Sequence, residues 1–209
     1  MGQASPAPGH AGFDAPLRID WLSADELPGG LSGRLGLTFL PGKRGASTRY
    51  PGRVYRRDTA ADLAAMREMG VVRLVLLVED DELERWSDSR MVALGEEAGL
   101  EVHRFPIPDG SAPPIELMDA IQADVDEGRA RGDVAVACMG GVGRTGTVAA
   151  CALVRAGRSP AEAIRRVRDV RHPEAVETAA QERLVAAYAV ERGAPARHGQ
   201  EDQPPGLLG

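Results

Sequence analysis

The sequence contains very little lysine, few aromatic residues and only two cysteines. Lys43 is the only lysine among 25 basic residues, and this preference for arginine is typical of a G+C-rich bacterial genome. The bias reflects codon usage and carries no information about chemistry. Cys138 and Cys151 are too few for a disulfide framework or for the ligand set of a structural zinc site.

Long apolar runs and an excess of positive charge are also missing. No stretch approaches the ~20 apolar residues of a membrane span, and the opening residues MGQASPAPGH lack the charged and then apolar pattern of a secretion signal. A formal net charge of -6 argues against a nucleic-acid-binding protein, whose surface is basic. We therefore expect a cytoplasmic protein that binds neither membranes nor nucleic acid.

The 209 residues suffice for one hydrophobic core and are too few for two full domains. Residues 1–16 and 193–209 are rich in Gly, Pro and small polar residues and offer little apolar surface to offset the entropy of ordering. The sequence therefore predicts a single domain over residues 17–192 between two disordered tails.

Strand and helix patterns alternate within this domain. The apolar run 71–78 is typical of a strand buried on both faces, and further strands are predicted over 17–22, 34–40, 101–107 and 133–138. Helices are predicted over 58–69, 89–98, 114–130, 144–156, 160–169 and 173–192. The alternation predicts an α/β fold with a central, mainly parallel sheet flanked by helices. Cys138 then lies at the carboxyl end of a strand, where open α/β sheets bind ligands.

The segment CMGGVGRTG, residues 138–146, follows that strand and fits two phosphate-binding patterns. From Gly141 it matches G-x-G-x-x-G, but a dinucleotide site needs a second strand that ends in an acidic residue about 20 residues later, and two helical patterns stand there instead. A nucleotide-binding P-loop fails as well, because Arg144 stands where its lysine would be. The other pattern is a loop of six residues that places a cysteine before a phosphate-binding arginine.

This second interpretation accounts for every residue type in the loop. Backbone N–H groups from residues 139–144 would converge on one point, and the following helix would add the positive end of its dipole. Glycines at 140, 141 and 143 would permit the tight turn, and the planar fork of Arg144 would match two phosphate oxygens. The same electric field would lower the pKa of Cys138 and make its thiolate available as a nucleophile. The predicted phosphate-binding set is Met139, Gly140, Gly141, Val142, Gly143 and Arg144.

The sequence resembles the cysteine-dependent protein tyrosine and dual-specificity phosphatases. VACMGGVGRTG is similar to their phosphate-binding loop, and RFPIPDGSAPP, residues 104–114, is similar to the general-acid loop of the dual-specificity members. The segments LTFLPGKR and VRDVRHPEAVETAAQ resemble the kinase-associated, or cyclin-dependent kinase inhibitor, branch most closely, and the likeness covers about residues 35–189.

The resemblance implies a role for four residues and requires no metal or organic cofactor. Cys138 would attack phosphorus and form a phosphocysteine, while Arg144 would hold the equatorial oxygens. Asp109 would protonate the leaving group and then act as the base on water, and Thr145 would assist departure of the sulfur. The implied partner is a phosphorylated protein or peptide, carrying phosphotyrosine, phosphoserine or phosphothreonine. With few aromatic residues and neutral Met139 and Val142 in the loop, we expect a shallow pocket without added charge for small polyanions.

The sequence departs from the family at Ala137, where relatives carry a histidine that organises the loop and lowers the pKa of the thiol. Two alternatives therefore stay open: a weak or inactive phosphate-reading binding module, and a rhodanese-like sulfur transferase, which would leave Asp109 unexplained. The oligomeric state is not predicted.

Other candidates receive structural interpretations. Cys151 is predicted to be packed behind the loop, and EDDELE, residues 79–84, is interpreted as the solvated start of a helix. Gln181 is expected to support the core, with the positioning of a water molecule as the alternative. Arg165, Arg166, Arg168 and Arg171 are expected to form a basic face, or Arg168 or Arg171 to buttress the sheet or the loop. The histidines lack metal-ligand spacing: His10, His103, His172 and His198.

Overall fold

The computed structural model describes residues 17–47 and 49–193. The two predicted tails, apart from Gly193, therefore lie outside the described residues. No helix within this part of the chain combines the length and the apolar character needed to cross a bilayer.

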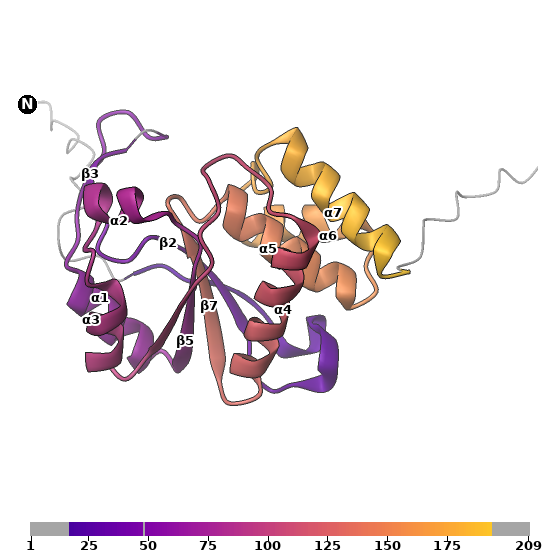
Figure 1. Cartoon of the computed structure of the whole chain (residues 1–209), viewed down its shortest axis with the longest axis horizontal. Helices are drawn as coiled ribbons and strands as arrows, with labels where there is room; N and C mark the ends of the chain where they lie inside the picture. The colour runs from indigo at the N-terminus through magenta and orange to yellow at the C-terminus, as the bar shows by residue number, and fades with distance from the viewer. Residues whose placement is uncertain (1–16, 48, 194–209) are drawn as a thin grey trace, which may run out of the picture.

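A five-stranded sheet forms the centre of the fold, in the order β1-β2-β7-β5-β6 (Figure 1). β2, β7, β5 and β6 run parallel, and β1 adds an antiparallel edge. The strands span Asp20–Leu22 (β1), Leu35–Phe39 (β2), Val71–Leu76 (β5), Glu101–Arg104 (β6) and Asp133–Cys138 (β7). In the register of β2 with β7, Phe39 lies opposite Cys138.

Helices cover both faces of the sheet, so the prediction of a single α/β domain with a mainly parallel sheet is confirmed. α1 and α3 lie on one face, and α4 and α5 lie on the other, with α6 and α7 packed against α5 (Figure 1). The helices span Thr59–Glu68 (α1), Asp80–Trp86 (α2), Met91–Glu97 (α3), Ile115–Arg129 (α4), Gly143–Arg155 (α5), Pro160–Val170 (α6) and Ala179–Glu191 (α7).

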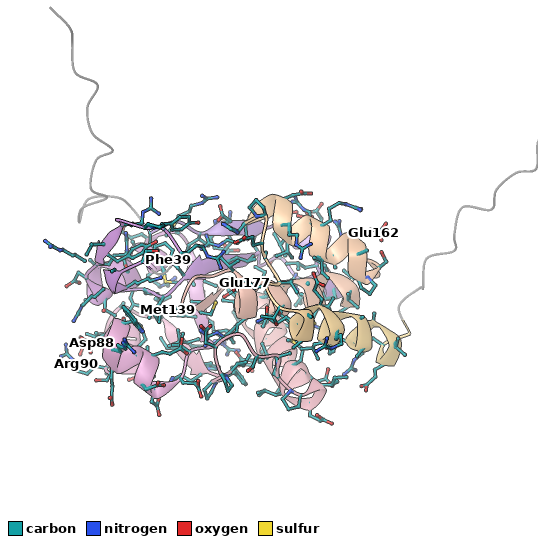
Figure 2. The ribbon with its side chains drawn as sticks, turned by 90° about the horizontal axis from the view of Figure 1, so that it is seen from above. Phe39, Asp88, Arg90, Met139, Glu162 and Glu177 are labelled. Carbon is teal, nitrogen blue, oxygen red and sulfur yellow. The ribbon has the colours of Figure 1, made fainter. Side chains whose placement is uncertain are left out.

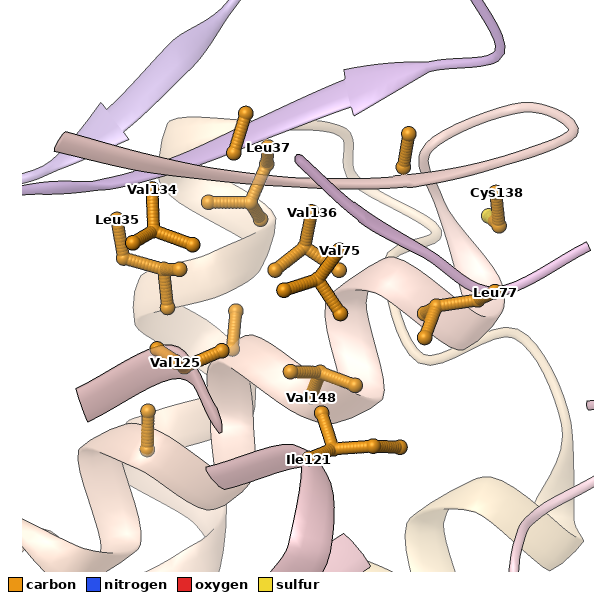
Figure 3. Close-up of a cluster of buried hydrophobic side chains, with 14 of the residues drawn as sticks. Leu35, Leu37, Val75, Leu77, Ile121, Val125, Val134, Val136, Cys138 and Val148 are labelled. Carbon is orange, nitrogen blue, oxygen red and sulfur yellow. The ribbon is translucent and has the colours of Figure 1, made fainter. Parts of the chain in front are cut away.

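The main core lies between the sheet and helices α4 and α5. Side chains of β2, β5 and β7 meet Ile121, Val125 and Val148 from the helices, and Cys138 stands at one end of this cluster (Figure 3). Every residue from Gly143 to Val154 in α5 is buried. Because α5 begins at the phosphate loop, burying this helix also fixes the position of the loop.

Helix boundaries follow local capping chemistry. α5 ends before Gly157, whose φ of 93° favours glycine, and α6 begins three residues later, at Pro160. Ser159 and Glu162 form a capping box at this start, and Pro160 occupies the first helical position, where its missing N–H costs nothing. The turn therefore brings α6 back onto α5.

The predicted helix over 173–192 begins six residues late, at Ala179. His172 accepts a turn hydrogen bond from the N–H of Ala175 at 2.8 Å, and Val176 adopts a left-handed φ of 62°. The N–H of Val176 donates to the Val142 carbonyl at 3.3 Å, so the segment supports the phosphate loop instead of extending the helix. Thr178 then caps α7.

The sequence patterns did not predict a small antiparallel hairpin, β3 (Arg44–Ala46) and β4 (Val54–Arg56). Each strand has only three residues, which is too short for an alternating apolar pattern to be detected. The hairpin follows the turn after β2 and leads into α1, so it lies beside the carboxyl ends of the parallel strands.

Candidate active site

Cys138 ends β7, and residues 139–142 turn directly into α5. The turn requires glycine at 141, where φ is 67° and a Cβ atom would lie 2.4 Å from the Thr38 carbonyl oxygen. At Gly143 a Cβ would lie 2.3 Å from a carboxylate oxygen of Glu177, the end of a flexible side chain that can move aside. Gly140 has more room still and lies outside the left-handed region, so the turn depends most on Gly141.

The carbonyl groups of the loop are held by donors outside it. Arg171, at the end of α6, donates from Nε to the Gly141 carbonyl at 2.9 Å and from Nη2 to the Gly140 carbonyl at 3.3 Å. The same guanidinium pairs with Asp20 of β1 at 2.7 Å. Of the two arginines considered as buttresses, Arg171 contacts the loop itself, whereas Arg168 holds the carbonyls of Ala175 and Val176 in the supporting segment.

The thiol of Cys138 is buried in a positive environment. Burial opposes ionisation, but Arg144, the Thr145 hydroxyl and backbone N–H groups of Thr145 and Val142 outweigh it and lower the pKa of Cys138. Thr145 Oγ1 is buried and has no other hydrogen-bond partner among the described residues, so this hydroxyl is available to the sulfur. This environment stabilises the thiolate more than the surroundings of an ordinary cysteine do.

Arg144 lies under the loop with its side chain 1% exposed. Its Nη2 donates to Asp109 at 2.9 Å, and its Nη1 donates to the Ile107 carbonyl at 2.8 Å. Burial opposes the charge, but Glu82, Cys138 and Asp109 hold the pKa of Arg144 above its ordinary value. Its Nε is buried without a partner among the described residues and remains available for an anion.

Glu82 is a site residue that the sequence analysis missed. Both of its carboxylate oxygens accept from Arg144, at 2.6 and 2.7 Å, and its side chain is 12% exposed. The interpretation of EDDELE as a solvated helix start is therefore wrong at this position, although Glu82 also closes the capping box of α2. In the sequence, only the spacing of Glu79 and Glu82, which is typical of a capping box, indicated that Glu82 could be partly buried. Its pairing with Arg144 had no local signal, because 62 residues separate the two.

Asp109 stands on the loop between β6 and α4 with its side chain 77% exposed. The start of α7 holds this loop: the capping residue Thr178 donates to the Gly110 carbonyl at 3.0 Å, and Gln181 in the first turn donates to the Ser111 carbonyl at 3.1 Å. Gln181 is fully buried and accepts from the N–H of Glu177, so its contacts are those of core support.

The turn after β2 brings Lys43, and the unpredicted hairpin brings Tyr55, to the end of the sheet where Phe39 lies. Lys43, only 8% exposed, donates from Nζ to the Met139 carbonyl at 3.1 Å and lies 4.6 Å from the Tyr55 ring centroid. Tyr55 packs against Phe39 of β2 with 5.9 Å between ring centroids. Figure 2 labels Phe39, Met139 and Glu177 around this end of the sheet. Met139 and Val142 within the loop are neutral, and the basic residue that contacts the loop is Lys43, which is 96 residues away from Met139 in the sequence.

Cys151 behaves as predicted. It is fully buried in α5, and burial, followed by the charge of Asp119, raises its pKa well above the ordinary thiol value. Among residues 17–47 and 49–193, no group of three or more His, Cys, Asp or Glu side chains is placed to hold a metal ion.

A buried cysteine at the end of a parallel strand, a glycine loop, an arginine and an acid on a neighbouring loop together define a site that can bind a phosphoryl group. The family model of DSP-PTPase phosphatases from polymorphic toxin systems matches residues 51–158, more than half of the chain. The chain therefore belongs to the dual-specificity phosphatase-like family.

Within this family the chain is similar to cyclin-dependent kinase inhibitor 3. It is 30% identical to the Sus scrofa protein over 169 residues, which cover 78% of this chain and 74% of the relative. The Homo sapiens protein is 29% identical over the same coverage.

Two solved structures support this relationship. Kinase-associated phosphatase with its catalytic cysteine replaced by serine gives a TM-score of 0.75 at 26% identity, covering 88% of this chain and 99% of that one. Tk-PTP in its active form gives a TM-score of 0.60 at 32% identity, covering 77% and 94%.

Proposed function

We propose that this protein hydrolyses phosphate monoesters on proteins or peptides through a phosphocysteine at Cys138. The observation that carries the proposal is one cluster: a thiol whose pKa is lowered, an arginine with a free buried Nε, and an acid in contact with that arginine. Membership of a phosphatase family supports the reaction class.

In the first step, the Cys138 thiolate attacks phosphorus and the bond from phosphorus to the ester oxygen breaks. Asp109 gives its proton to the departing oxygen, so a neutral alcohol or phenol leaves. Arg144 and the loop N–H groups hold the phosphoryl oxygens as charge develops on them. In the second step, a water molecule attacks phosphorus while Asp109 takes its proton. The bond from sulfur to phosphorus breaks, and the Thr145 hydroxyl stabilises the departing thiolate.

The arrangement around Arg144 suits an exchange of partners. Glu82 occupies one edge of the guanidinium with both oxygens and fixes its plane. Asp109 holds Nη2 from an exposed position, so a phosphoryl group can take that place while Asp109 moves to the leaving oxygen. Arg144 thereby orients the acid in the free protein and the phosphate in the complex.

Phosphorylated proteins are the substrate class we favour. The names of the related cyclin-dependent kinase inhibitor 3 and kinase-associated phosphatase associate those proteins with kinases. The exposure of Asp109 fits a shallow site that accepts phosphotyrosine, phosphoserine and phosphothreonine. Comparing kcat/KM for three peptides that differ only in the phosphorylated residue measures this preference.

Metal-free hydrolysis of an aryl phosphate is the direct test. With a chelator present, the wild-type protein should turn over, and Cys138→Ser should lose about 10³-fold or more in kcat while still binding vanadate, because Arg144 and the loop remain. Cys151→Ser is the matched control and should keep its activity, since this thiol lies packed in α5. Near-normal activity of Cys138→Ser would exclude the phosphocysteine route.

A phosphate-reading binding module is a second candidate, and Ala137 is the observation that favours it. This position is fully buried beside the nucleophile and offers only a methyl group to organise the loop. A module of this kind would retain a phosphopeptide at micromolar concentration and show no hydrolysis at any pH between 5 and 9. Turnover in the chelator-treated assay excludes it.

A further inference from the structure

Ala137, the residue before the proposed nucleophile, has no polar or charged side-chain group that could stabilise the loop or the thiolate. Its backbone pairs with β2 and β5, and its side chain is fully buried. Any positive charge that supports the thiolate must therefore come from elsewhere in the fold. Arg144 supplies one such charge. Lys43, which contacts the first carbonyl of the loop, supplies a second.

The backbone fixes where Lys43 stands. The preceding Gly42 has a φ of 68°, and a Cβ atom there would lie 1.9 Å from the Thr59 hydroxyl, so the turn packs tightly on the start of α1. The N–H of Gly42 donates to Asp62 at 2.8 Å, and the Lys43 carbonyl accepts from Arg57 at 3.0 Å. The side chain is nine-tenths buried and its ammonium group lies over Tyr55.

The contact of Lys43 is one of a set of hydrogen bonds that hold the carbonyl groups of residues 139–142. A carbonyl oxygen that faced the phosphate would repel it, and each of the first four loop carbonyls is instead held by a donor outside the anion site. Lys43 holds Met139, and Arg171 holds Gly140 and Gly141. The Val142 carbonyl accepts from the N–H groups of Gly146 and Val176. Lys43 therefore anchors the residue directly after the nucleophile.

We propose that Lys43 is a positioning residue that turns the Met139 carbonyl away from the anion site and places its ammonium charge beside the Cys138 thiolate, a task for which Ala137 offers no side chain. The proposal rests on the proposed function of Cys138 as a thiolate nucleophile. Lys43 forms no bond to substrate in this role and acts through the loop and the sulfur.

Arg144 is the charge that lowers the pKa of Cys138 most, and the interaction of Cys138 with Lys43 is seen at Lys43. Burial lowers the pKa of Lys43, and among charged groups the Cys138 thiolate opposes that effect most strongly. Arg49 lowers the pKa of Lys43 and Asp109 raises it. The remaining charged groups that face the site are Arg144, its partner Glu82, Arg171 under the loop, and Glu177 beside Gly143.

The test is the ionisation of Cys138, measured without any phosphatase assay. The rate of alkylation of Cys138 by iodoacetamide, an uncharged reagent, is followed by mass spectrometry from pH 4 to 9. Lys43→Met should move the midpoint toward alkaline pH by about one unit, the effect of losing a nearby opposite charge. At pH values below both midpoints, its alkylation rate should then fall about tenfold. Lys43→Arg should recover more than half of the shift.

Arg56→Met is the matched control, because it removes one positive charge from the same hairpin at an exposed position. Its midpoint should equal that of the wild-type protein. A Lys43→Met midpoint within 0.3 unit of wild type, or an equal shift in Arg56→Met, would overturn the proposal.

A second measurement needs no substitution at Lys43. The chain has a single lysine, so reductive ¹³C-methylation labels one side chain, and the dimethylammonium retains one N–H for the Met139 carbonyl. Coupling between two sites is reciprocal. Alkylation of Cys138 should therefore lower the NMR titration midpoint of Lys43, and an unchanged midpoint would overturn the proposal even if Lys43→Met fails to fold.

The two proposals fail separately. If the Cys138 midpoint depends on Lys43 but the protein hydrolyses no phosphate ester, the proposed function is wrong and the positioning role stands. If the protein hydrolyses aryl phosphates and the alkylation midpoint of Cys138 does not depend on Lys43, only the positioning role is wrong.

Discussion

Gly140 and Gly141 are adjacent and chemically identical, yet their surroundings differ. Gly141 combines a φ of 67° with a backbone oxygen only 2.4 Å from where a Cβ would lie, whereas the nearest atom to such a Cβ at Gly140 is 3.8 Å away. We expect Gly141→Ala to lower kcat/KM at least about 100-fold and to destabilise the fold by about 2–4 kcal/mol, because backbone strain and overlap add.

Gly140→Ala is the paired control for this prediction. It should retain activity within a few-fold of wild type and an unchanged melting temperature. Aryl phosphate kinetics and thermal unfolding of both variants check the contrast, and equal losses in the two variants would contradict the loop geometry.

In the free protein Asp109 pairs with Arg144, whereas its proposed role is to donate a proton to the leaving group of a bound substrate. In the proposed mechanism Asp109 is the general acid, so its effect on the rate should grow with the need of the leaving group for a proton. Asp109→Asn should cost about 10²- to 10⁴-fold in kcat for an alkyl phosphate and far less for a nitrophenyl phosphate. Rates of wild type and variant on both esters measure the ratio, and equal losses would remove the acid assignment.

At the scale of elements, α2 contributes a buried carboxylate rather than a solvated helix start. Burial opposes ionisation of Glu82, but its contacts with Arg144 and the Glu79 N–H lower its pKa, so it stays charged at neutral pH. Glu82→Gln would leave Arg144 with one weaker partner on that edge. We expect kcat/KM to fall about 10- to 100-fold.

Glu84→Gln provides the control on the same helix, since this side chain is exposed. It removes the same charge and should leave both activity and melting temperature unchanged. Steady-state kinetics with aryl phosphate compare the two variants, and a Glu82→Gln enzyme as active as the control would mean that α2 does not orient Arg144.

The segment before α7 shows a second coupling between elements. Val176 supports residues 139–142, and Thr178, together with Gln181 in the first turn of α7, holds the loop that carries Asp109. The delayed start of α7 therefore places one stretch of chain against both loops.

At the scale of the whole molecule, Glu26 connects the N-terminal edge of the sheet to α6. Its carboxylate accepts from Arg166 Nε at 2.6 Å and from Arg158 at 3.1 Å. The hydrogen bond from Arg166 is the main cause that lowers the pKa of Glu26 to about 2, against the opposing effect of burial. Because the folded-state pKa lies below the unfolded value of 4.5, the stabilisation is complete above that value and is lost as the pH falls toward 2.

Glu26→Gln should therefore lower the free energy of unfolding by about 1–2 kcal/mol at pH 7, a figure reduced for solvent screening. The difference from wild type should shrink steadily between pH 5 and pH 3. Urea unfolding at several pH values measures it, with exposed Asp25→Asn as the control that should show no such difference. A gap between wild type and Glu26→Gln that does not change with pH would contradict the assignment.

The sequence alone determined those features that depend on neighbouring residues. Apolar runs and helix caps predicted the alternation of strands and helices, and with it the parallel sheet and the position of Cys138 at a strand end. The glycine loop and Arg144 lie within eight residues of one another, so their spacing already indicated a phosphate site. The order of the strands within the sheet had no such local signal.

The tertiary structure alone decided which distant side chains complete the site. Glu82 and Arg144 are 62 residues apart, and Lys43 and Met139 are 96 apart, so no local pattern links them. Glu82 and Lys43 also resemble ordinary solvated charges in the sequence, because charged residues in loops and helix starts are usually exposed. Only the packing of α2 and of the turn after β2 against the carboxyl ends of the strands removes these charges from water and directs them at the phosphate loop.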